Sequence, residues 1–184
     1  MKKPKLLLLD SDVVIHCHEI GVWEAIKAKF DVHVTSIVTD EAEYAKTPIG
    51  TVRIDLAAQA EREEVTIVEA SAVEMFEITN RFADSFSQGL DDGETEGLAV
   101  LSRNDLDDCK FCCGDTNAQE AVGMLGLREQ AISLEEILDF AGVRPVAPSQ
   151  MKPHFRKSSL EIHTNKGAAR RITGECFKKS PLGL

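Results

Sequence analysis

Short, unbroken apolar runs alternate along this chain with longer stretches whose apolar residues recur at helical spacing. The first run, Leu6–Leu9, is typical of a strand buried on both faces, and Asp10 follows it directly. Comparable runs predict the other strands, at residues 31–38, 65–68 and 110–113, with an edge strand at 131–132.

Helical patterns fill the stretches between and after these strands. They cover residues 13–30 with a break near Gly21, a helix that starts at Thr39 or Asp40, and residues 54–64, 71–86, 94–102, 116–125 and 133–142. Strands that alternate with helices in this way are typical of a parallel sheet with helices on both faces. The predicted fold class is therefore α/β, a three-layer α/β/α sandwich with a parallel sheet of four or five strands, formed by residues 1–144.

Residues 145–184 are predicted to be a separate extension, which begins with a linker containing Pro145, Pro148 and Pro153. Beyond the linker we expect a strand at 159–163 and a short basic helix at 167–177. The last 35 residues carry eight Lys and Arg against two Glu, whereas residues 1–149 carry 13 against 29 Asp and Glu. An acidic body argues against bulk electrostatic binding of nucleic acid, although the basic extension could supply phosphate contacts. Packing of the extension on its own acidic body explains the charges equally well.

Composition limits the compartment and the number of domains. A chain of 184 residues with 43% hydrophobic content is long enough for one well-buried domain. No apolar run approaches the roughly 18 residues of a membrane span, and the first run is too short for a signal-peptide core. Five cysteines, an odd number, fit reduced thiols better than a disulfide framework. We therefore expect a cytoplasmic protein with no membrane partner.

Acidic residues follow the predicted strands where each strand ends. Asp10 follows the first strand, Glu41 the second and Asp115 the fourth, while Glu94 and Glu96 begin the helix before the fourth strand. Because the carboxyl ends of parallel strands meet at one edge of the sheet, these acids can converge. Two unit charges about 4 Å apart repel by roughly 4 kcal/mol at an effective dielectric near 20, so such a cluster calls for a cation. Oxygen ligands favour Mg²⁺ or Mn²⁺, ions that support hydrolysis of phosphodiester bonds.

Several segments resemble the PIN domains (PilT N-terminus), metal-dependent ribonucleases that include VapC-type toxins. Residues 6–15 are similar to the family's opening, an apolar run followed by Asp and a small hydroxyl residue, with Asp12 at a position that is usually Asn-like. Residues 93–99 (Gly-Glu-Thr-Glu-Gly-Leu-Ala) are similar to a Gly-Glu-x-Glu-Ala signature, with Gly97 in place of the usual Ala. Residues 115–127, an Asp followed by a helix that ends in Leu-Gly-Leu, resemble the closing block, and residues 131–138 are also similar.

The resemblance implies which residues would form the site. Asp10, Glu41, Glu96 and Asp115 would be the catalytic, metal-binding quartet, and Ser11 and Asn117 would position the substrate. Glu94, Asp12 and Asp92 are secondary candidates for the metal, and Lys166, Arg170 and Arg171 are candidates for contact with RNA.

The choice between Glu94 and Glu96 depends on helix geometry. Positions two apart on a helix point about 200° apart, so only one of the two can face the site. The other is expected to be an acid favoured by the dipole at the helix N-terminus. We favour Glu96, and Asp92, one helical repeat earlier, would join it if the helix starts early.

The predicted function is a Mg²⁺- or Mn²⁺-dependent endoribonuclease acting on single-stranded or structured RNA. The resemblance suggests the toxin of a toxin–antitoxin pair, with an antitoxin protein as partner and a homodimeric state. Two alternatives stay open. The chain could be a PIN-like module that binds nucleic acid or protein with a weak or lost catalytic site, or a nuclease directed at DNA.

Overall fold

A four-stranded parallel sheet forms the centre of the computed structural model, which describes residues 6–103, 108–143 and 150–178. The strand order is β5-β2-β1-β6. The strands are β1 (Leu6–Leu9), β2 (Asp31–Thr35), β5 (Thr66–Val68) and β6 (Lys110–Cys112). The predicted α/β class with a parallel sheet is confirmed, with four strands in the described chain. The edge strand expected at 131–132 is reduced to a single parallel bridge between Phe111 and Ala131.

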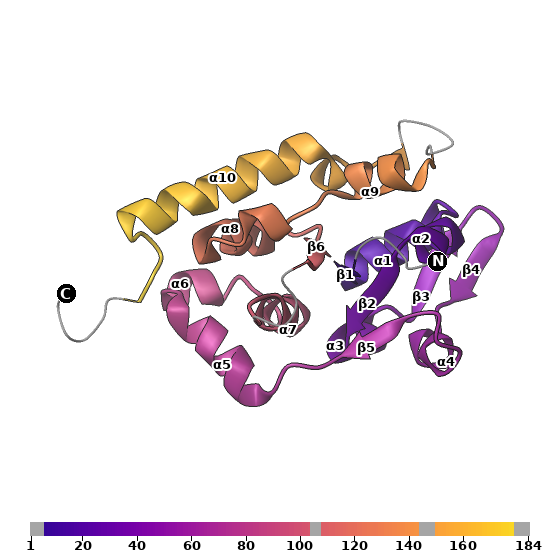
Figure 1. Ribbon diagram of the computed structural model, residues 1–184, viewed down its shortest axis with the longest axis horizontal. Helices are drawn as coiled ribbons and strands as arrows, with labels where there is room; N and C mark the ends of the chain where they lie inside the picture. The colour runs from indigo at the N-terminus through magenta and orange to yellow at the C-terminus, as the bar shows by residue number, and fades with distance from the viewer. Residues whose placement is uncertain (1–5, 104–107, 144–149, 179–184) are drawn as a thin grey trace.

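Helices cover both faces of this sheet (Figure 1). They are α1 (Ser11–Glu19), α2 (Trp23–Lys29), α3 (Ser36–Glu41), α4 (Leu56–Glu61), α5 (Ala72–Arg81), α6 (Asp84–Ser87), α7 (Asp92–Leu101), α8 (Thr116–Leu125), α9 (Leu134–Ala141) and α10 (Lys157–Thr173), with short 3₁₀ turns η1 (Arg128–Gln130) and η3 (Pro153–Phe155). No helix in the described ranges is both long and apolar enough to cross a membrane.

The central strand β1 explains the three layers. Its side chains alternate between the faces, so Leu7 and Leu9 pack in one hydrophobic cluster and Leu8 in the other. The first cluster includes residues of α1, α2 and α9, and the second includes residues of α5, α7 and α8. All three leucines are at most 1% exposed, which is why β1 is apolar without interruption.

The segment after β2 differs from the prediction. The strand ends at Thr35, whose hydroxyl caps α3 by accepting from the Val38 N–H, so the helix starts three residues before the expected Thr39. Glu41 therefore lies at the end of α3 rather than at its start. The chain then forms an antiparallel hairpin, β3 (Tyr44–Thr47) with β4 (Gly50–Arg53), where the sequence predicted no strand.

The C-terminal extension also differs, because the strand expected at 159–163 is part of the 17-residue helix α10. This helix runs along α8 (Figure 1). A Cβ on Gly123 would overlap the backbone of Thr164, and a Cβ on Gly167 would overlap the carbonyl of Glu120, so the two helices touch through their backbones. The boundary at residue 144 lies outside the described residues and stays a prediction, while the described part of the extension packs on α8.

Candidate functional site

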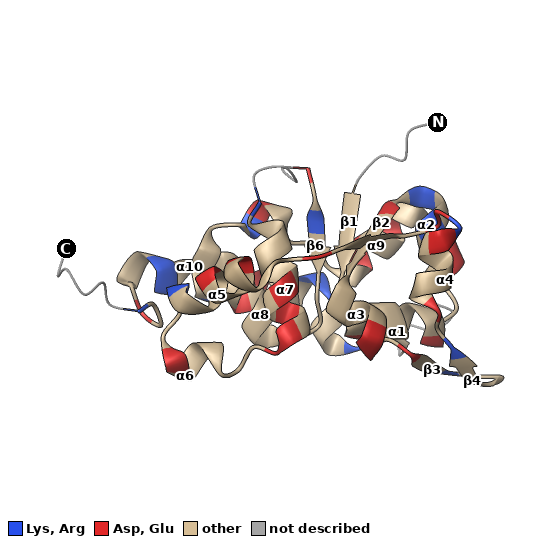
Figure 2. Cartoon of the chain, turned by 90° about the horizontal axis from the view of Figure 1, so that it is seen from below, with Lys and Arg blue, Asp and Glu red and all other residues tan. Residues whose placement is uncertain are grey.

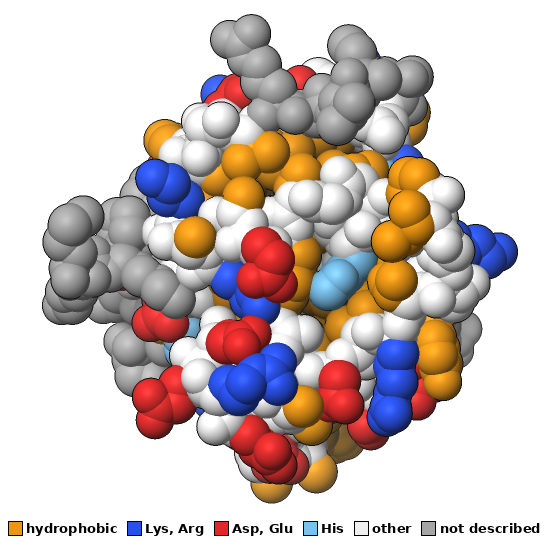
Figure 3. Space-filling view, turned by 90° about the vertical axis from the view of Figure 1, so that its right-hand side faces the viewer, with side chains coloured by type: hydrophobic (Ala, Val, Ile, Leu, Met, Phe, Trp, Pro, Cys, Tyr) orange, Lys and Arg blue, Asp and Glu red, His pale blue; other side chains and the backbone are white. Residues whose placement is uncertain are grey.

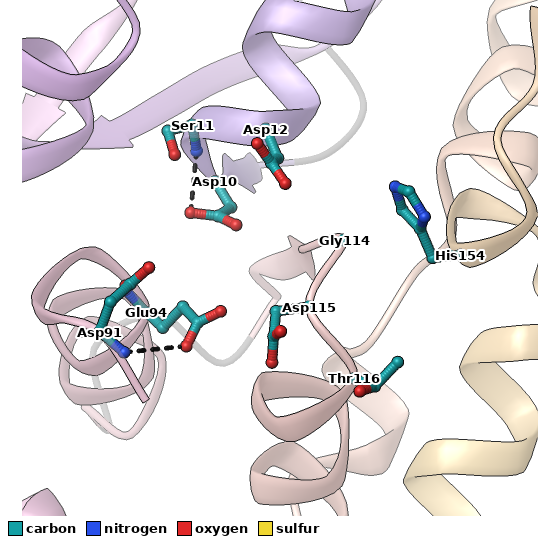
Figure 4. A pocket seen from close by; sticks show the side chains of 9 residues that line it. All are labelled: Asp10, Ser11, Asp12, Asp91, Glu94, Gly114, Asp115, Thr116 and His154. Carbon is teal, nitrogen blue, oxygen red and sulfur yellow. Dashed lines mark hydrogen bonds between the residues drawn. The ribbon is translucent and has the colours of Figure 1, made fainter. Parts of the chain in front are cut away.

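A pocket of about 390 Å³ opens at the carboxyl edge of the sheet. Figure 4 shows Asp10, Glu94 and Asp115 around it, with their carboxyl groups directed toward a common space. Asp10 follows β1, Glu94 belongs to α7 and Asp115 precedes α8, so the pocket brings together two acids of the expected quartet and the secondary candidate Glu94. The described lining of the pocket consists of these three acids and of Ser11, Asp12, Asp91, Gly114, Thr116 and His154.

Helix capping fixes the orientation of these acids. Asp10 caps α1 through a 2.8 Å hydrogen bond from the Ser11 N–H to Oδ1. Asp115 caps α8, and its Oδ1 accepts from the N–H groups of Asn117 at 2.6 Å and Ala118 at 3.0 Å. Glu94 is the second half of a capping box, in which its Oε2 accepts from the Asp91 N–H at 3.1 Å.

Each of the three carboxylates therefore uses one oxygen for a backbone N–H. Oδ2 of Asp10, Oδ2 of Asp115 and Oε1 of Glu94 accept no hydrogen bond from the described part of the chain. A carboxylate held in this way is fixed in direction and still offers one oxygen to a ligand. Oxygen donors of this kind are those that Mg²⁺ and Mn²⁺ prefer.

Burial and mutual repulsion disfavour the charged forms. Burial raises the pKa of Asp10 to about 7, with repulsion from Asp91, Asp12 and Glu41 adding to it. Burial and then the charge of Asp115 raise the pKa of Glu94 to about 8. Asp10 is 7% exposed and Glu94 is 5% exposed. A cation in the pocket would relieve this repulsion and hold both groups ionised.

Glu41 lies beside the pocket rather than in its lining. Its carboxylate packs against Gly93, where an added Cβ would come within 2.9 Å of Oε2. Burial raises the pKa of Glu41, as do the charges of Asp91, Asp12 and Asp92, while a hydrogen bond with Ser11 lowers it. The secondary candidates Asp12 and Asp92 thus belong to the same acidic neighbourhood, and Asp12 also lines the pocket.

Glu96, the acid preferred from the sequence, faces the other way. Its carboxylate accepts from the Ser36 hydroxyl at 2.7 Å, the Ile37 N–H at 2.9 Å and the Ala70 N–H at 3.2 Å. Burial opposes its ionisation, but the hydrogen bonds from Ile37, Ser36, Thr35 and Ala70 together outweigh burial and lower the pKa of Glu96. Glu96 thus joins α7 to the start of α3, and the structure brings Glu94 to the pocket in its place.

The two residues expected to position a substrate differ in their placement. Ser11 lines the pocket. Asn117 is turned toward the α6–α7 turn, where its Nδ2 donates to the Gly89 carbonyl at 3.1 Å. Asn117 therefore connects the start of α8 to this turn and is absent from the described pocket lining.

The three basic residues proposed to contact RNA are engaged within the fold. Lys166 Nζ lies 2.6 Å from Glu120 Oε1, and Arg170 Nη1 lies 2.5 Å from Glu120 Oε2. Glu120 is 3% exposed, so it is a buried charge that requires these partners. The guanidinium of Arg171 packs against Gly126. The basic face of α10 thus meets the acidic body, as one of the two sequence interpretations held.

His154 was not foreseen as a pocket residue. It belongs to η3, the short 3₁₀ turn just before α10. Its place in the pocket depends on packing of η3 against Gly114, in the loop after β6, and on the hydrogen bond from Gln119 of α8, which lies 35 residues earlier in the chain. No local motif signals such a contact.

The ligand types in the pocket suit a divalent cation, but the described side chains are not arranged as a preformed metal site. No group of three or more His, Cys, Asp or Glu among the described residues already lies close enough together to hold a metal ion. The acids do have one available oxygen each and raised pKa values at two positions, which fits a cation.

Comparisons with protein-family models, with curated proteins and with solved structures returned no match. The likeness to PIN domains therefore remains a resemblance of residues and spacing.

Proposed function

We propose that this protein is a Mg²⁺- or Mn²⁺-dependent endoribonuclease of PIN-like character. The observation that carries the proposal is the pocket formed by Asp10, Glu94 and Asp115 at the carboxyl edge of the parallel sheet. Asp10 and Glu94 are buried and Asp115 is partly exposed, the three acids come from three elements and repel one another, and each has an oxygen available. In the proposal these three acids bind the ion. Glu41, which lies beside Gly93, adds negative charge next to the pocket and thereby strengthens binding of the cation.

A bound divalent ion supplies positive charge to the scissile phosphate and to the leaving oxygen, which is the largest need in phosphodiester hydrolysis. The chain itself supplies position. The three caps hold the carboxylates in fixed directions, and Ser11 and Thr116 also line the pocket. No nucleophilic side chain is required.

The charge distribution favours local contact with a strand over bulk binding of a duplex. In Figure 2 acidic residues recur on α3, α5, α6 and α7, and basic residues are spread over several elements, among them α10, β6 and α2. On the face shown in Figure 3, acidic and basic side chains are interspersed, without a large patch of one sign. RNA is the proposed substrate because of the resemblance, so the assay compares it with DNA.

The biological setting belongs to the same proposal. A toxin of a toxin–antitoxin pair, an antitoxin partner and a cytoplasmic location follow from the resemblance, and five free cysteine thiols support a reducing compartment. Exposed Val73 and Phe76 on α5 support self-association, since Phe76 is 65% exposed.

The test is cleavage of labelled single-stranded RNA, single-stranded DNA and duplex DNA in Mn²⁺, in Mg²⁺ and in EDTA. We expect cleavage of RNA that EDTA abolishes. Asp10→Asn and Glu94→Gln are expected to lower the rate by about 100-fold or more, a typical loss for a group that acts at the reacting centre. Asp139→Asn, an exposed acid on α9, is the matched control and should cleave normally. Cleavage that persists in EDTA, or full activity of Asp10→Asn, would contradict the proposal.

The second candidate is a PIN-like binding module with a weak or lost catalytic site. It is favoured by the finding that no three described ligands already lie at metal-binding separation. Calorimetry with Mn²⁺ separates the two functions. Binding that disappears in Asp10→Asn supports the nuclease, whereas no Mn²⁺ binding and no cleavage support the module. Preferential cleavage of DNA in the same assay would support the DNA-directed alternative.

A further inference from the structure

The segment around η3 is anchored to the body of the protein from two sides. Phe155 is 2% exposed and its ring stacks on His16 of α1, with the ring centroids 4.9 Å apart. Lys152 Nζ lies 3.3 Å from Glu19 Oε2, also on α1. On the other side, the Gln119 side chain of α8 donates to the carbonyl of His154 at 3.2 Å.

The same glutamine connects η3 to the loop that carries Asp115. Gln119 Nε2 also donates to the Cys113 carbonyl at 3.0 Å, so one side-chain amide joins the loop after β6 to η3. Gly114 lies between Cys113 and Asp115 and lacks a Cβ, which at that place would come within 2.7 Å of Phe155 Cε1 and 3.2 Å of His154 Cδ2. The η3 turn is therefore fitted directly against the loop that ends β6.

These contacts bring the His154 ring to the rim of the acidic pocket (Figure 4). The other described lining residues offer carboxylates, hydroxyls and a glycine. His154 is thus the one nitrogen-bearing side chain in the described lining. A phosphodiester that enters the pocket meets acids on most sides. A hydrogen-bond donor to its non-bridging oxygens would offset part of this repulsion and so favour binding.

We propose that His154 is a positioning residue that donates a hydrogen bond from its ring N–H to a phosphate oxygen of the bound RNA strand. This inference rests on the proposed nuclease function and deepens it, because it makes the C-terminal extension part of the substrate site. The extension contributes one side chain to the pocket and, through Gln119, secures the loop that carries Asp115.

Burial and then the charge of Lys152 lower the pKa of His154, while Asp12 and Asp115 act in the opposite direction. In either protonation state the ring keeps at least one N–H to donate.

The test compares His154→Ala with His154→Asn, which keeps a side-chain N–H donor. His154→Ala is expected to lower kcat/KM for a single-stranded RNA dodecamer by about 10- to 100-fold, mainly through a higher KM. This is the loss typical of a hydrogen bond to a charged group. His154→Asn is expected to recover at least a third of the wild-type kcat/KM. Mn²⁺ affinity measured by calorimetry should stay within twofold of wild type in both variants. His163→Ala, a histidine on α10 that faces Glu120, is the matched control and should leave kcat/KM unchanged.

A second readout does not require cleavage. In Asp10→Asn protein with 15N-labelled histidine, long-range 1H–15N spectra report the ring nitrogens of His154 while the RNA dodecamer is added. A shift of that signal on binding is expected, and the signal is assigned to His154 by its absence from His154→Asn. If the wild-type protein fails to cleave RNA but this shift occurs, the nuclease proposal fails and the phosphate contact stands.

Three results would overturn the inference. The first is unchanged kcat/KM in His154→Ala in an enzyme that cleaves RNA. The second is a loss of Mn²⁺ affinity of tenfold or more in that variant, which would make His154 a metal ligand. The third is binding of RNA with no change in the His154 ring signal.

Discussion

Replacement of Asp10 by Asn should stabilise the protein in the absence of metal. The buried carboxyl has its pKa raised from 3.8 to about 7, so the folded state keeps a proton that the unfolded chain has lost between these values. By linkage, stability falls as the pH rises through this window, and the full cost is present above pH 7. Each pH unit is worth about 1.4 kcal/mol, so the cost of the charge is about 4 kcal/mol.

Asn has nearly the same shape as Asp and its Oδ1 can still accept from the Ser11 N–H, while it carries no charge. At pH 8.5 in EDTA we therefore expect Asp10→Asn to be more stable than wild type by about 2–4 kcal/mol. At pH 5 the gain should fall to less than half, because the wild-type carboxyl is then largely protonated in the folded state.

The measurement is urea unfolding followed by circular dichroism at pH 5, 7 and 8.5. Asp139→Asn, which changes an exposed acid, should differ from wild type by less than about 0.5 kcal/mol at each pH. A variant that is less stable than wild type at pH 8.5, or a gain that does not depend on pH, would refute the claim that Asp10 is a desolvated acid held among other acids. Under the proposed function, this gain in stability is the trade-off expected where a charge is kept for binding a cation.

Three further predictions follow from the same contacts. Glu94→Gln should stabilise the metal-free protein at pH 9, because it removes a buried charge. Glu96→Gln should destabilise the protein by about 1–3 kcal/mol, because the Glu96 carboxylate accepts hydrogen bonds from Ser36 and Ile37. The stability that Glu96 contributes is present above pH 4.5 and is lost on acidification through its lowered pKa. Gly167→Ala should cost about 1–3 kcal/mol, seen as a lower urea midpoint, because its Cβ would overlap the Glu120 carbonyl of α8. Excess Mn²⁺ should raise the Tm of wild type by calorimetry and leave that of Glu94→Gln nearly unchanged, and an equal rise in both would contradict metal binding at Glu94.

The layers of the fold were predictable because their physical cause is local. The strand β1 is buried on both faces and is therefore an unbroken apolar run, and the acid that follows it caps the next helix. Asp115 was found by the same logic, since the Asp after a short apolar strand caps α8. Burial and capping each leave a signature within about ten residues.

Elements that depend on distant contacts were missed. The hairpin of β3 and β4 buries only Ala45 on its inner side, with Val52 half-buried, so its sequence carries little apolar alternation. In α10 the buried positions Leu160, Thr164 and Gly167 do recur at helical spacing. Thr164 and Gly167 are small or polar, however, so their burial follows from close contact with α8 rather than from hydrophobicity, and hydrophobic periodicity could not detect it.

The assignment of Glu94 and Glu96 shows where pattern reasoning ended and tertiary geometry decided. Both lie near the N-terminus of α7, about 200° apart, so each must face something different. Asp91 caps the helix and takes Glu94 into its capping box, which ties Glu94 to the helix start that faces Asp10 and Asp115. The same rotation directs Glu96 toward α3, where the first N–H groups of that helix need an acceptor. The first N–H groups of α3 are thus accepted by Glu96 of α7, and Glu94 is the acid of α7 that faces the pocket. The signal available in the sequence was the capping box formed by Asp91 and Glu94. It places Glu94 at the start of α7, which is the end of the helix that faces Asp10.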